Sequence, residues 1–250
     1  NNFIGGLARS WTHNNFILDT GPHIFHTEDK EVENEWNSIG HDLFSFGNFR
    51  SCNILEKYNN HLFDYPLSIE TLQKNLDSEL FENINFELNN LSQESGFRNA
   101  TTFKDFMEGK VGKKLSELFF TEYPEKLWGL KTENMIADWA PQRIELRKNS
   151  GPFYQKPFVA IGKYGTGSFY KKIIDLLKID ETFSLNLNNN LIKVNFKNGR
   201  IEQLIFDNGK KINISDGDQV ISTIPASILS RLLGVNLSLN FRGVRSQYLF

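Results

Sequence analysis

Hydrophobic positions recur at helical spacing through the middle of the chain. From Asp29, the apolar residues Val32, Trp36 and Ile39 stand at i, i+4 and i+7, and acidic residues occupy the expected first turn. The same spacing returns between Ser68 and roughly Leu130, at Leu72, Leu76, Leu80, Phe81, Val111, Leu115, Leu118 and Phe119. The pattern predicts a helix of about three turns from Asp29 and a mainly helical stretch over 68–130.

Two local signals divide this helical stretch. Thr102 followed by Asp105 resembles a capping arrangement for a helix that carries Phe106. The polar residues 89–99 are typical of a loop between two helices.

Short β-favouring runs come before the helical stretch. Phe16–Leu18 ends at Asp19-Thr20-Gly21-Pro22, where the Gly-Pro pair interrupts the backbone, so we predict a strand followed by a loop. The runs Ile54–Tyr58 and His61–Tyr65 are joined by Asn59-Asn60. Because asparagine tolerates the positive φ of a two-residue turn, these residues predict a β-hairpin.

After Phe183 the chain changes to β-rich runs. The runs 191–196, 201–206 and 212–214 are separated by two Asn-Gly pairs, which are the strongest short-range signal for a hairpin. An antiparallel meander is therefore predicted.

Further elements are predicted on both sides of the meander. Tyr164–Ser168 introduces a helix whose apolar face begins at Phe169. Beyond the meander, Gln219–Thr223 has the composition of a buried strand, and a helix over Ala226–Leu233 follows Pro225.

Composition narrows the class of protein. The 250 residues contain 28 Lys and Arg against 30 Asp and Glu, so no bulk positive field is available to hold a nucleic acid or an anionic membrane. No apolar run approaches the ~18 residues that a membrane span needs. The single cysteine, Cys52, cannot form an internal disulfide. We therefore expect a soluble, cytoplasmic protein without a membrane span.

Candidate chemistry begins with glycine-containing loops at Gly5-Gly6-Leu7-Ala8-Arg9, Gly21-Pro22-His23 and Gly165-Thr166-Gly167. Each suits close approach of the backbone to a ligand, or simply a turn. The sequence contains neither G-x-G-x-x-G nor a Walker-type lysine motif. His23 and His26 are three residues apart, but the preceding Gly-Pro favours a loop and no carboxylate completes a set, so no metal site is predicted.

Two further groups leave alternatives open. The stretch 119–129 gathers aromatic residues around Lys126, which suits either packing at a helix end or one wall of a ligand site. Arg143 and Arg147 are four residues apart and would share a helix face. Such a pair can capture a phosphate or carboxylate, or it can form a solvated face together with Glu145.

The order of these motifs resembles the FAD-dependent amine-oxidase superfamily, in particular its protoporphyrinogen-oxidase-like proteins and UDP-galactopyranose mutases. Gly21–Thr27 is similar to the mutase motif, whereas Ala137–Arg143 is closer to the oxidase-like branch. The matching stretches run almost end to end, at 5–10, 19–27, 62–67, 119–129, 137–143 and 220–225.

The resemblance implies positions for an FAD cofactor and a small-molecule substrate, although it identifies no catalytic residue. Residues expected along the FAD are Gly5, Gly6, Leu7, Arg9, Gly21, Pro22, His23, Gly165 and Gly167. Residues expected to face the substrate are Tyr123, Lys126, Trp128, Arg143 and Arg147, with one of the two arginines meeting an anionic group.

The resemblance also implies a mixed α/β fold in two parts. A partial FAD/NAD(P)-binding, Rossmann-like domain with an antiparallel meander would comprise 1–28 and 160–235. A mainly helical substrate-binding domain with a β-hairpin would comprise 29–159 and 236–250. The family's opening βαβ unit, which carries G-x-G-x-x-G, and its C-terminal flavin-contacting segment have no counterpart in the sequence. We therefore expect a fragment of a longer protein, with exposed apolar surface and an unpaired sheet edge if it stands alone.

Three functions follow from these expectations. The first is an FAD-dependent oxidoreductase that transfers a hydride between a substrate and the flavin. The second is a flavin-dependent isomerase, similar to UDP-galactopyranose mutase, that acts on a nucleotide sugar. The third is an inactive fragment. The sequence does not decide the oligomeric state.

Overall fold

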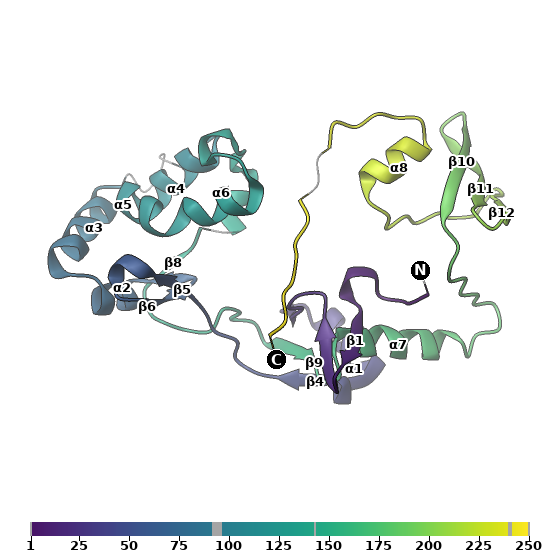
Figure 1. Ribbon diagram of the computed structural model, residues 1–250, viewed down its shortest axis with the longest axis horizontal. Coiled ribbons are helices and arrows are strands. Elements are labelled where there is room, and N and C mark those ends of the chain that lie inside the picture. The colour runs from purple at the N-terminus through teal and green to yellow at the C-terminus, as the bar shows by residue number, and fades with distance from the viewer. Residues whose placement is uncertain (1, 92–96, 143, 240–241, 250) are drawn as a thin grey trace. The chain divides into compact units, whose positions relative to one another are not determined.

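The computed structural model describes residues 2–91, 97–142, 144–239 and 242–249. The chain divides into two compact units (Figure 1). Unit 1 comprises Asn1–Phe46 and Ala160–Phe250, and unit 2 comprises Gly47–Val159. The predicted mixed α/β fold with an antiparallel meander is confirmed.

Unit 1 begins with a 3-10 turn and a two-stranded hairpin. The hairpin pairs Ser10 with Asp19 at its open end, and its turn residues Asn14 and Asn15 have φ of 46° and 67°. The predicted strand before Gly21 is thereby confirmed. The helices of unit 1 are α1 Lys30–Gly40, α7 Thr166–Leu177 and α8 Ala226–Leu232, and its 3-10 turns are Gly6–Ala8 and His41–Leu43. Its strands are β1 Ser10–His13, β2 Phe16–Asp19, β3 Phe25–Thr27, β4 Phe44–Phe46, β10 Leu191–Lys197, β11 Arg200–Phe206 and β12 Lys211–Asn213. Strand β9, Phe158–Gly162, begins with the last two residues of unit 2 and continues into unit 1.

Aromatic packing forms the core of unit 1. The ring of Phe25 lies 5.0 Å from that of Phe44, 5.2 Å from that of Phe169 and 5.3 Å from that of Trp36. Strands β3, β9 and β4 form one sheet in that order. The predicted helix is α1, and the side chain of its N-cap, Asp29, accepts a hydrogen bond of 2.8 Å from the amide of Glu31. These contacts bring residues 29–46 into unit 1.

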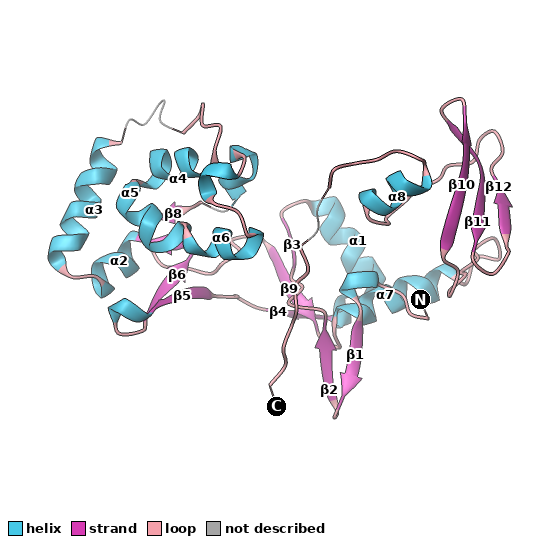
Figure 2. Cartoon of the chain, turned by 45° about the horizontal axis from the view of Figure 1, so that its top comes forward, coloured by secondary structure: helices cyan, strands magenta, loops and turns pink. Residues whose placement is uncertain are grey.

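The predicted meander is confirmed as β10, β11 and β12, which lie side by side (Figure 2). The predicted helix after Pro225 is α8. The predicted strand over 219–223 is wrong, since these residues are irregular and Ile221 is 87% exposed. A β-branched run becomes a buried strand only when neighbouring strands accept and donate its backbone hydrogen bonds. None of the strands in the described ranges pairs with it.

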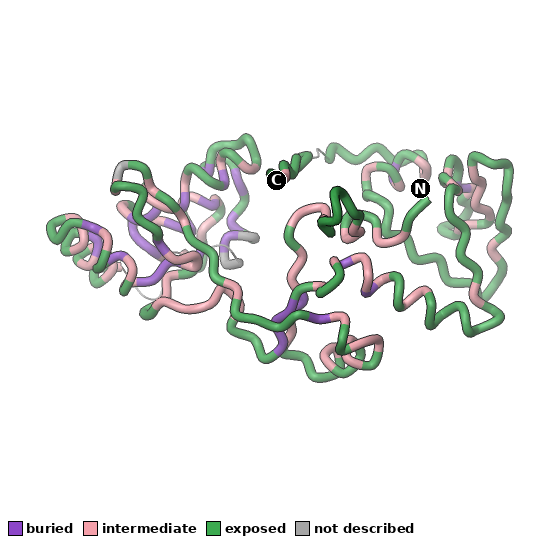
Figure 3. The backbone as a smooth tube through the Cα atoms, turned by 60° about the horizontal axis from the view of Figure 1, so that its bottom comes forward, coloured by how far each residue is buried: buried purple, intermediate pink, exposed green. Residues whose placement is uncertain are grey.

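Unit 2 packs helices against a hairpin, and Figure 3 shows that buried residues follow these helices. Its core contains Phe63, Leu72, Phe103, Met107 and Leu115, all of them at most 1% exposed. The elements are β5 Ser51–Leu55, the 3-10 turn Glu56–Tyr58, β6 His61–Tyr65, β7 Leu67–Ser68, α2 Ile69–Asn75, α3 Ser78–Asn90, α4 Phe103–Val111, α5 Lys113–Leu115, a π-helical turn Ser116–Phe120, α6 Glu122–Trp128, the 3-10 segments Thr132–Asn134 and Ala137–Gln142, and β8 Leu146–Arg147.

The predicted hairpin of unit 2 is confirmed, but the predicted bounds of its first strand, Ile54–Tyr58, are wrong. That strand, β5, ends at Leu55 instead of Tyr58, because Glu56–Tyr58 form a 3-10 turn before the two left-handed residues Asn59 and Asn60. The predicted cap of α4 is confirmed, since Thr102 Oγ1 accepts a 3.1 Å hydrogen bond from the amide of Asp105.

The C-terminal segment also lies in unit 1. The hydroxyl of Tyr248 donates to the backbone oxygen of Asp19, and its ring meets that of Trp11 edge-to-face at 5.8 Å.

The assignment of cofactor binding to one unit and substrate binding to the other stays a prediction. Within the described ranges, no helix has both the length and the apolar character needed to cross a membrane.

Candidate functional site

The first glycine loop forms an exposed turn in unit 1. Gly5 and Gly6 have φ of 90° and 54°, and the amide of Ala8 donates to the oxygen of Gly5 at 2.8 Å. A Cβ on Gly6 would meet nothing within 4 Å, and Leu7 is 80% exposed. This turn therefore leaves space for a ligand beside its backbone.

Arg9 follows this turn and stacks on aromatic rings. Its guanidinium carbon lies 4.0 Å from the ring centre of Phe3 and 5.8 Å from that of Trp11. The side chain lines a cavity of about 910 Å³ that also includes Gly167, Lys171 and aliphatic residues after α7. Of the predicted cofactor residues, this cavity brings together Arg9 and Gly167.

The second glycine loop follows β2. Gly21 has a φ of 88°. The Oγ1 of Thr20 and the Nδ1 of His23 are buried, and neither has a hydrogen-bond partner among the described residues. Such groups are costly unless a ligand or water completes their hydrogen bonds. His23 lines a second cavity of about 370 Å³ with Trp36, Phe169 and Tyr170.

The third glycine loop leads into α7 and packs tightly on the hairpin. A Cβ on Gly165 would lie 2.7 Å from Ser10 Cβ and 2.8 Å from Ile17 Cγ2, and one on Gly167 would lie 2.6 Å from the backbone nitrogen of Ser10. Close packing of protein against protein therefore accounts for both glycines. Whether they also contact a cofactor stays a prediction.

Unit 2 contains a cavity of about 260 Å³ with aromatic walls. Tyr123 and Leu127 of α6 contribute one side, because residues four apart share a helix face. Tyr65 of β6 also lines the cavity. The remaining lining residues are Ser51, Cys52, Asn53, Phe103, Phe119, Phe120, Pro124 and Ile144.

The predicted substrate residues of α6 do not all reach this cavity. Tyr123 lines it and is 66% exposed, whereas Lys126 and Trp128 are exposed and are not among its lining residues. The helix ends at Trp128, and the following residue, Gly129, has a φ of 67°. The amide of Gly129 donates to the backbone carbonyl oxygen of Glu125 at 2.7 Å. One helix thus supplies both a cavity wall and an exposed aromatic side chain.

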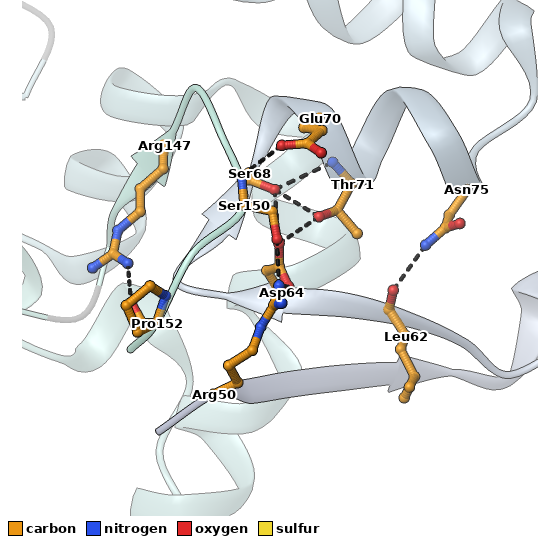
Figure 4. Close-up of polar contacts among 10 residues, drawn as sticks. All are labelled: Arg50, Leu62, Asp64, Ser68, Glu70, Thr71, Asn75, Arg147, Ser150 and Pro152. Atoms are coloured by element: carbon orange, nitrogen blue, oxygen red, sulfur yellow. Dashed lines mark hydrogen bonds and ion pairs between the residues drawn. The ribbon is translucent and has the colours of Figure 1, made fainter. Parts of the chain in front are cut away.

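The guanidinium of Arg147 binds backbone carbonyl groups a few residues later in the chain (Figure 4). It donates to the carbonyl oxygens of Pro152 at 2.6 Å and Phe153 at 3.1 Å, and it pairs with Glu145 at 2.8 Å. The predicted helix face for the two arginines is wrong, because Arg147 lies in β8, which pairs with β7 in parallel. Arg143 lies outside the described residues. The alternative of a solvated face that includes Glu145 is correct only in that Arg147 pairs with Glu145.

A carboxylate network stands beside this segment (Figure 4). Asp64 accepts hydrogen bonds from Thr71 Oγ1 at 2.6 Å, from Ser68 Oγ at 3.1 Å and from Arg50 Nη2 at 3.2 Å. Partial burial alone would raise the pKa of Asp64, but the hydrogen bonds from Ser150, Thr71, Ser68 and Arg50 together lower it. The network fastens the hairpin to α2 and to the segment near Ser150.

Sequence reasoning missed the hairpin's contribution to the cavity of unit 2. Ser51 pairs with Tyr65 and Asn53 with Phe63, so these side chains lie on one face of the hairpin. That alternation was available as a signal, but the predicted strand began at Ile54, after all three lining residues of β5. Among the described residues, no group of three or more His, Cys, Asp or Glu side chains is arranged to hold a metal ion.

The sequence profile of the family described as "Flavin containing amine oxidoreductase" matches residues 1–245, almost the whole chain. The chain belongs to this family. The predicted superfamily is thereby confirmed.

Two individual proteins of known name are similar to this chain in sequence. A "Probable UDP-galactopyranose mutase" of Klebsiella pneumoniae is 24% identical over 168 residues, which are 67% of this chain and 41% of that protein. A dTDP-fucopyranose mutase of Escherichia coli is 24% identical over 159 residues, 62% of this chain and 40% of that protein. The chain thus spans less than half the length of either relative.

Solved structures share the fold. A crystal structure of reduced UDP-galactopyranose mutase has a TM-score of 0.72 at 20% identity and covers 93% of this chain and 50% of its own. A structure from Exiguobacterium sp. 255-15, assigned as a protoporphyrinogen oxidase, has a TM-score of 0.62 at 16% identity and covers 92% of this chain and 53% of its own. The fold is thus shared with both kinds of protein that the sequence resembles, UDP-galactopyranose mutases and protoporphyrinogen-oxidase-like proteins.

The residues of unit 1 fit a flavin on their own geometry. The space beside Gly6 and the buried, unpartnered atoms of Thr20 and His23 are features that a bound polar ring system would complete. The third loop fits less directly, because Gly165 and Gly167 face Ser10.

Proposed function

We propose that this flavoprotein is a mutase that rearranges the sugar ring of a nucleoside diphosphate sugar. The observation that carries the proposal is that two relatives of this chain are named as nucleotide-sugar mutases, one for a UDP-sugar and one for a dTDP-sugar. These two substrates share a pyrimidine base, a diphosphate and a pyranose. The substrate class is therefore favoured over any particular sugar.

The cavity of unit 2 is the proposed pocket for the base. Phe119, Phe120 and Tyr123 offer aromatic faces on which a pyrimidine can stack, and Ser51 and Asn53 offer polar groups to its edge. Its volume of about 260 Å³ is below the roughly 300–1,000 Å³ of sites that enclose a whole drug-sized ligand. It suits one end of a nucleotide sugar, with the rest extending past the exposed Lys126 and Trp128.

FAD is the proposed cofactor, with Gly5, Gly6, Arg9, Gly21 and His23 beside it. When bound, it supplies the nucleophilic or hydride-transfer chemistry that side chains lack. Arg9 would neutralise phosphate charge, since a guanidinium binds phosphate oxygens in pairs. The Nδ1 of His23, which has no partner among the described residues, would orient the ring by a hydrogen bond. Arg143 and Arg147 stay proposals for an anionic substrate group.

A second candidate is an FAD-dependent oxidoreductase that passes a hydride between a small molecule and the flavin. The likeness to the protein assigned as a protoporphyrinogen oxidase favours it. The two candidates differ in net oxidation and reduction. A mutase leaves substrate and flavin at their starting oxidation states, whereas an oxidoreductase needs an electron acceptor.

The first experiment measures binding of UDP by calorimetry with the purified chain. Tyr123→Ala is compared with Phe86→Ala, which removes an exposed aromatic ring of the same unit that does not line the cavity. Loss of one stacking face should weaken UDP binding about ten- to a hundredfold. Equal binding by the two variants would remove the cavity from the proposal.

The second experiment decides the chemistry. The chain is loaded with FAD, the flavin is reduced, and UDP-galactopyranose is added without oxygen. Formation of an isomeric sugar nucleotide with no change in the flavin spectrum would support the mutase. In a parallel sample with oxidised FAD, loss of the oxidised flavin's absorption in step with oxidation of the added substrate would support the oxidoreductase instead. A chain that binds neither FAD nor UDP would be the inactive fragment.

A further inference from the structure

The β1–β2 hairpin and the start of α7 are joined by a compact set of hydrogen bonds around Asp19. The Asp19 carboxylate accepts from the amide of Thr166 at 3.1 and 3.2 Å and from its hydroxyl at 2.6 Å. The hydroxyl of Ser10 donates to the same carboxylate and accepts from the amide of Gly167 at 2.7 Å. Two residues paired across the hairpin therefore cap a helix that begins 147 residues after Asp19 in the sequence.

This cap uses donors that would otherwise be free. The first amides of a helix have no partner within it, and they attract carboxylates and phosphates alike. At α7, the amides of Thr166 and Gly167 are already paired with side chains of the chain itself. The missing Cβ atoms of Gly165 and Gly167 allow the hairpin to approach this closely. The start of α7 is thus a joint within the protein, and it is closed to a cofactor phosphate.

The residue that carries this carboxylate also begins the turn Asp19–His23. Gly21 donates its amide to the backbone carbonyl oxygen of Asp19 at 2.8 Å, and the buried, unpartnered side-chain atoms of Thr20 and His23 belong to the same turn. Thr166, which Asp19 holds, is 2% exposed and lines the cavity of His23. A shift of Asp19 would therefore move the turn and the cavity wall together.

We infer that Asp19 is a positioning residue of the flavin site, which fixes the turn Asp19–His23 against α7 without touching the cofactor itself. The inference rests on the proposed binding of FAD at this turn. It assigns Ser10 and Thr166 to the same device, and it gives Gly165 and Gly167 a packing role in place of cofactor contact.

The test compares Asp19→Ala and Asp19→Asn with Asp180→Asn. Asp180 is a fair control because its carboxylate also accepts from the amide and hydroxyl of a threonine, Thr182, at 2.8 and 2.7 Å, but on an exposed surface of unit 1. The measurements are FAD affinity, the position of the flavin absorption band, and hydrogen exchange at Thr166 and Gly167. All are made where circular dichroism shows each variant folded.

In Asp19→Ala, exchange at Thr166 and Gly167 should speed up about tenfold, as expected for loss of a helix cap. FAD binding should weaken by a similar factor and the flavin band should move. Asp19→Asn keeps an acceptor oxygen and should recover part of each effect. Asp180→Asn should change none of them.

Two results would overturn the inference separately from the proposed function. If the unchanged chain binds FAD, and Asp19→Ala binds it equally with an unmoved absorption band, Asp19 has no positioning role. If the unchanged chain binds no FAD, the proposed cofactor site fails first, and the exchange data report only on the joint. Should Asp19→Ala not fold, Thr166→Val removes one hydrogen bond with little change of shape and takes its place.

Discussion

Glu87 of α3 holds Lys114 of α5 at two points. One carboxylate oxygen accepts from the backbone amide of Lys114 and the other from its Nζ, each at 3.0 Å. The carboxylate thereby caps the start of α5 and neutralises a lysine, from a helix 27 residues earlier. This contact ties together two helices of unit 2 through charge and capping at once.

Replacing Glu87 should make unit 2 less stable and less sensitive to acid. Burial alone would raise the pKa of Glu87, but the amide and ammonium of Lys114 together lower it. A carboxylate with a lowered pKa in the folded state stabilises above the ordinary glutamate value of 4.5, and this contribution disappears as the pH falls through the folded pKa. Glu87→Gln should therefore cost about 1 kcal/mol at pH 7 and less at pH 3.

Urea unfolding at both pH values checks this prediction. Glu82→Gln is the matched control, because Glu82 is an exposed residue of the same helix. A loss of stability in Glu87→Gln that is as large at pH 3 as at pH 7 would contradict the linkage.

Asp64 should contribute a second acid-sensitive term. The hydrogen bonds that lower its pKa place its contribution above the ordinary aspartate value of 3.8, with loss at lower pH. Asp64→Asn disturbs several hydrogen bonds to a charged acceptor, each worth roughly 1.5–3 kcal/mol. We expect the midpoint of unfolding at pH 7 to fall clearly, while Asp138→Asn, at an exposed position of unit 2, stays within about 0.5 kcal/mol of the unchanged chain. Equal midpoints for the two variants would show that the network adds no stability.

The sequence correctly predicted the elements that depend on interactions between residues close together in the chain. The cap at Thr102, the turn at Asn59-Asn60 and the Asn-Gly turns of the meander each depend on neighbours in the sequence, and the structure contains all of them. The strand over 219–223 failed for the opposite reason, since a strand also needs partners that no local pattern specifies.

The candidate sites show the same division. Tyr123 was found because aromatic residues cluster in the sequence, and it lines the cavity. Asp19 was not singled out, because its partner Thr166 is separated from it by 147 residues, and only the folded chain brings the two together. Arg147 was assigned to a helix on spacing alone, whereas pairing with β7 places it in a strand.

Gly165 should tolerate alanine far less than Gly199, although both have a φ of 79°. The backbone strain of a positive φ is then the same in both variants, at about 1 kcal/mol. At Gly199 a Cβ meets nothing within 4 Å, while at Gly165 it runs into Ser10 and Ile17. Overpacking should add a further 1–3 kcal/mol or so at Gly165. Thermal unfolding of Gly165→Ala and Gly199→Ala measures the difference directly, and equal shifts would mean that the hairpin does not press against α7.

Arg147 provides the sharpest test between a substrate contact and a structural role. Its guanidinium already donates to the carbonyl oxygens of Pro152 and Phe153 and pairs with Glu145, and its side chain is 15% exposed. Removing it leaves two carbonyl groups without these donors, so Arg147→Ala should cost about 1–3 kcal/mol of stability. Arg98→Ala, at an exposed position of the same unit, should stay within about 0.5 kcal/mol of the unchanged chain. If the role is structural, UDP affinity measured where both variants are folded should be equal. A tenfold loss of UDP affinity in Arg147→Ala, at unchanged stability, would instead make Arg147 the anion-binding residue that the sequence proposed.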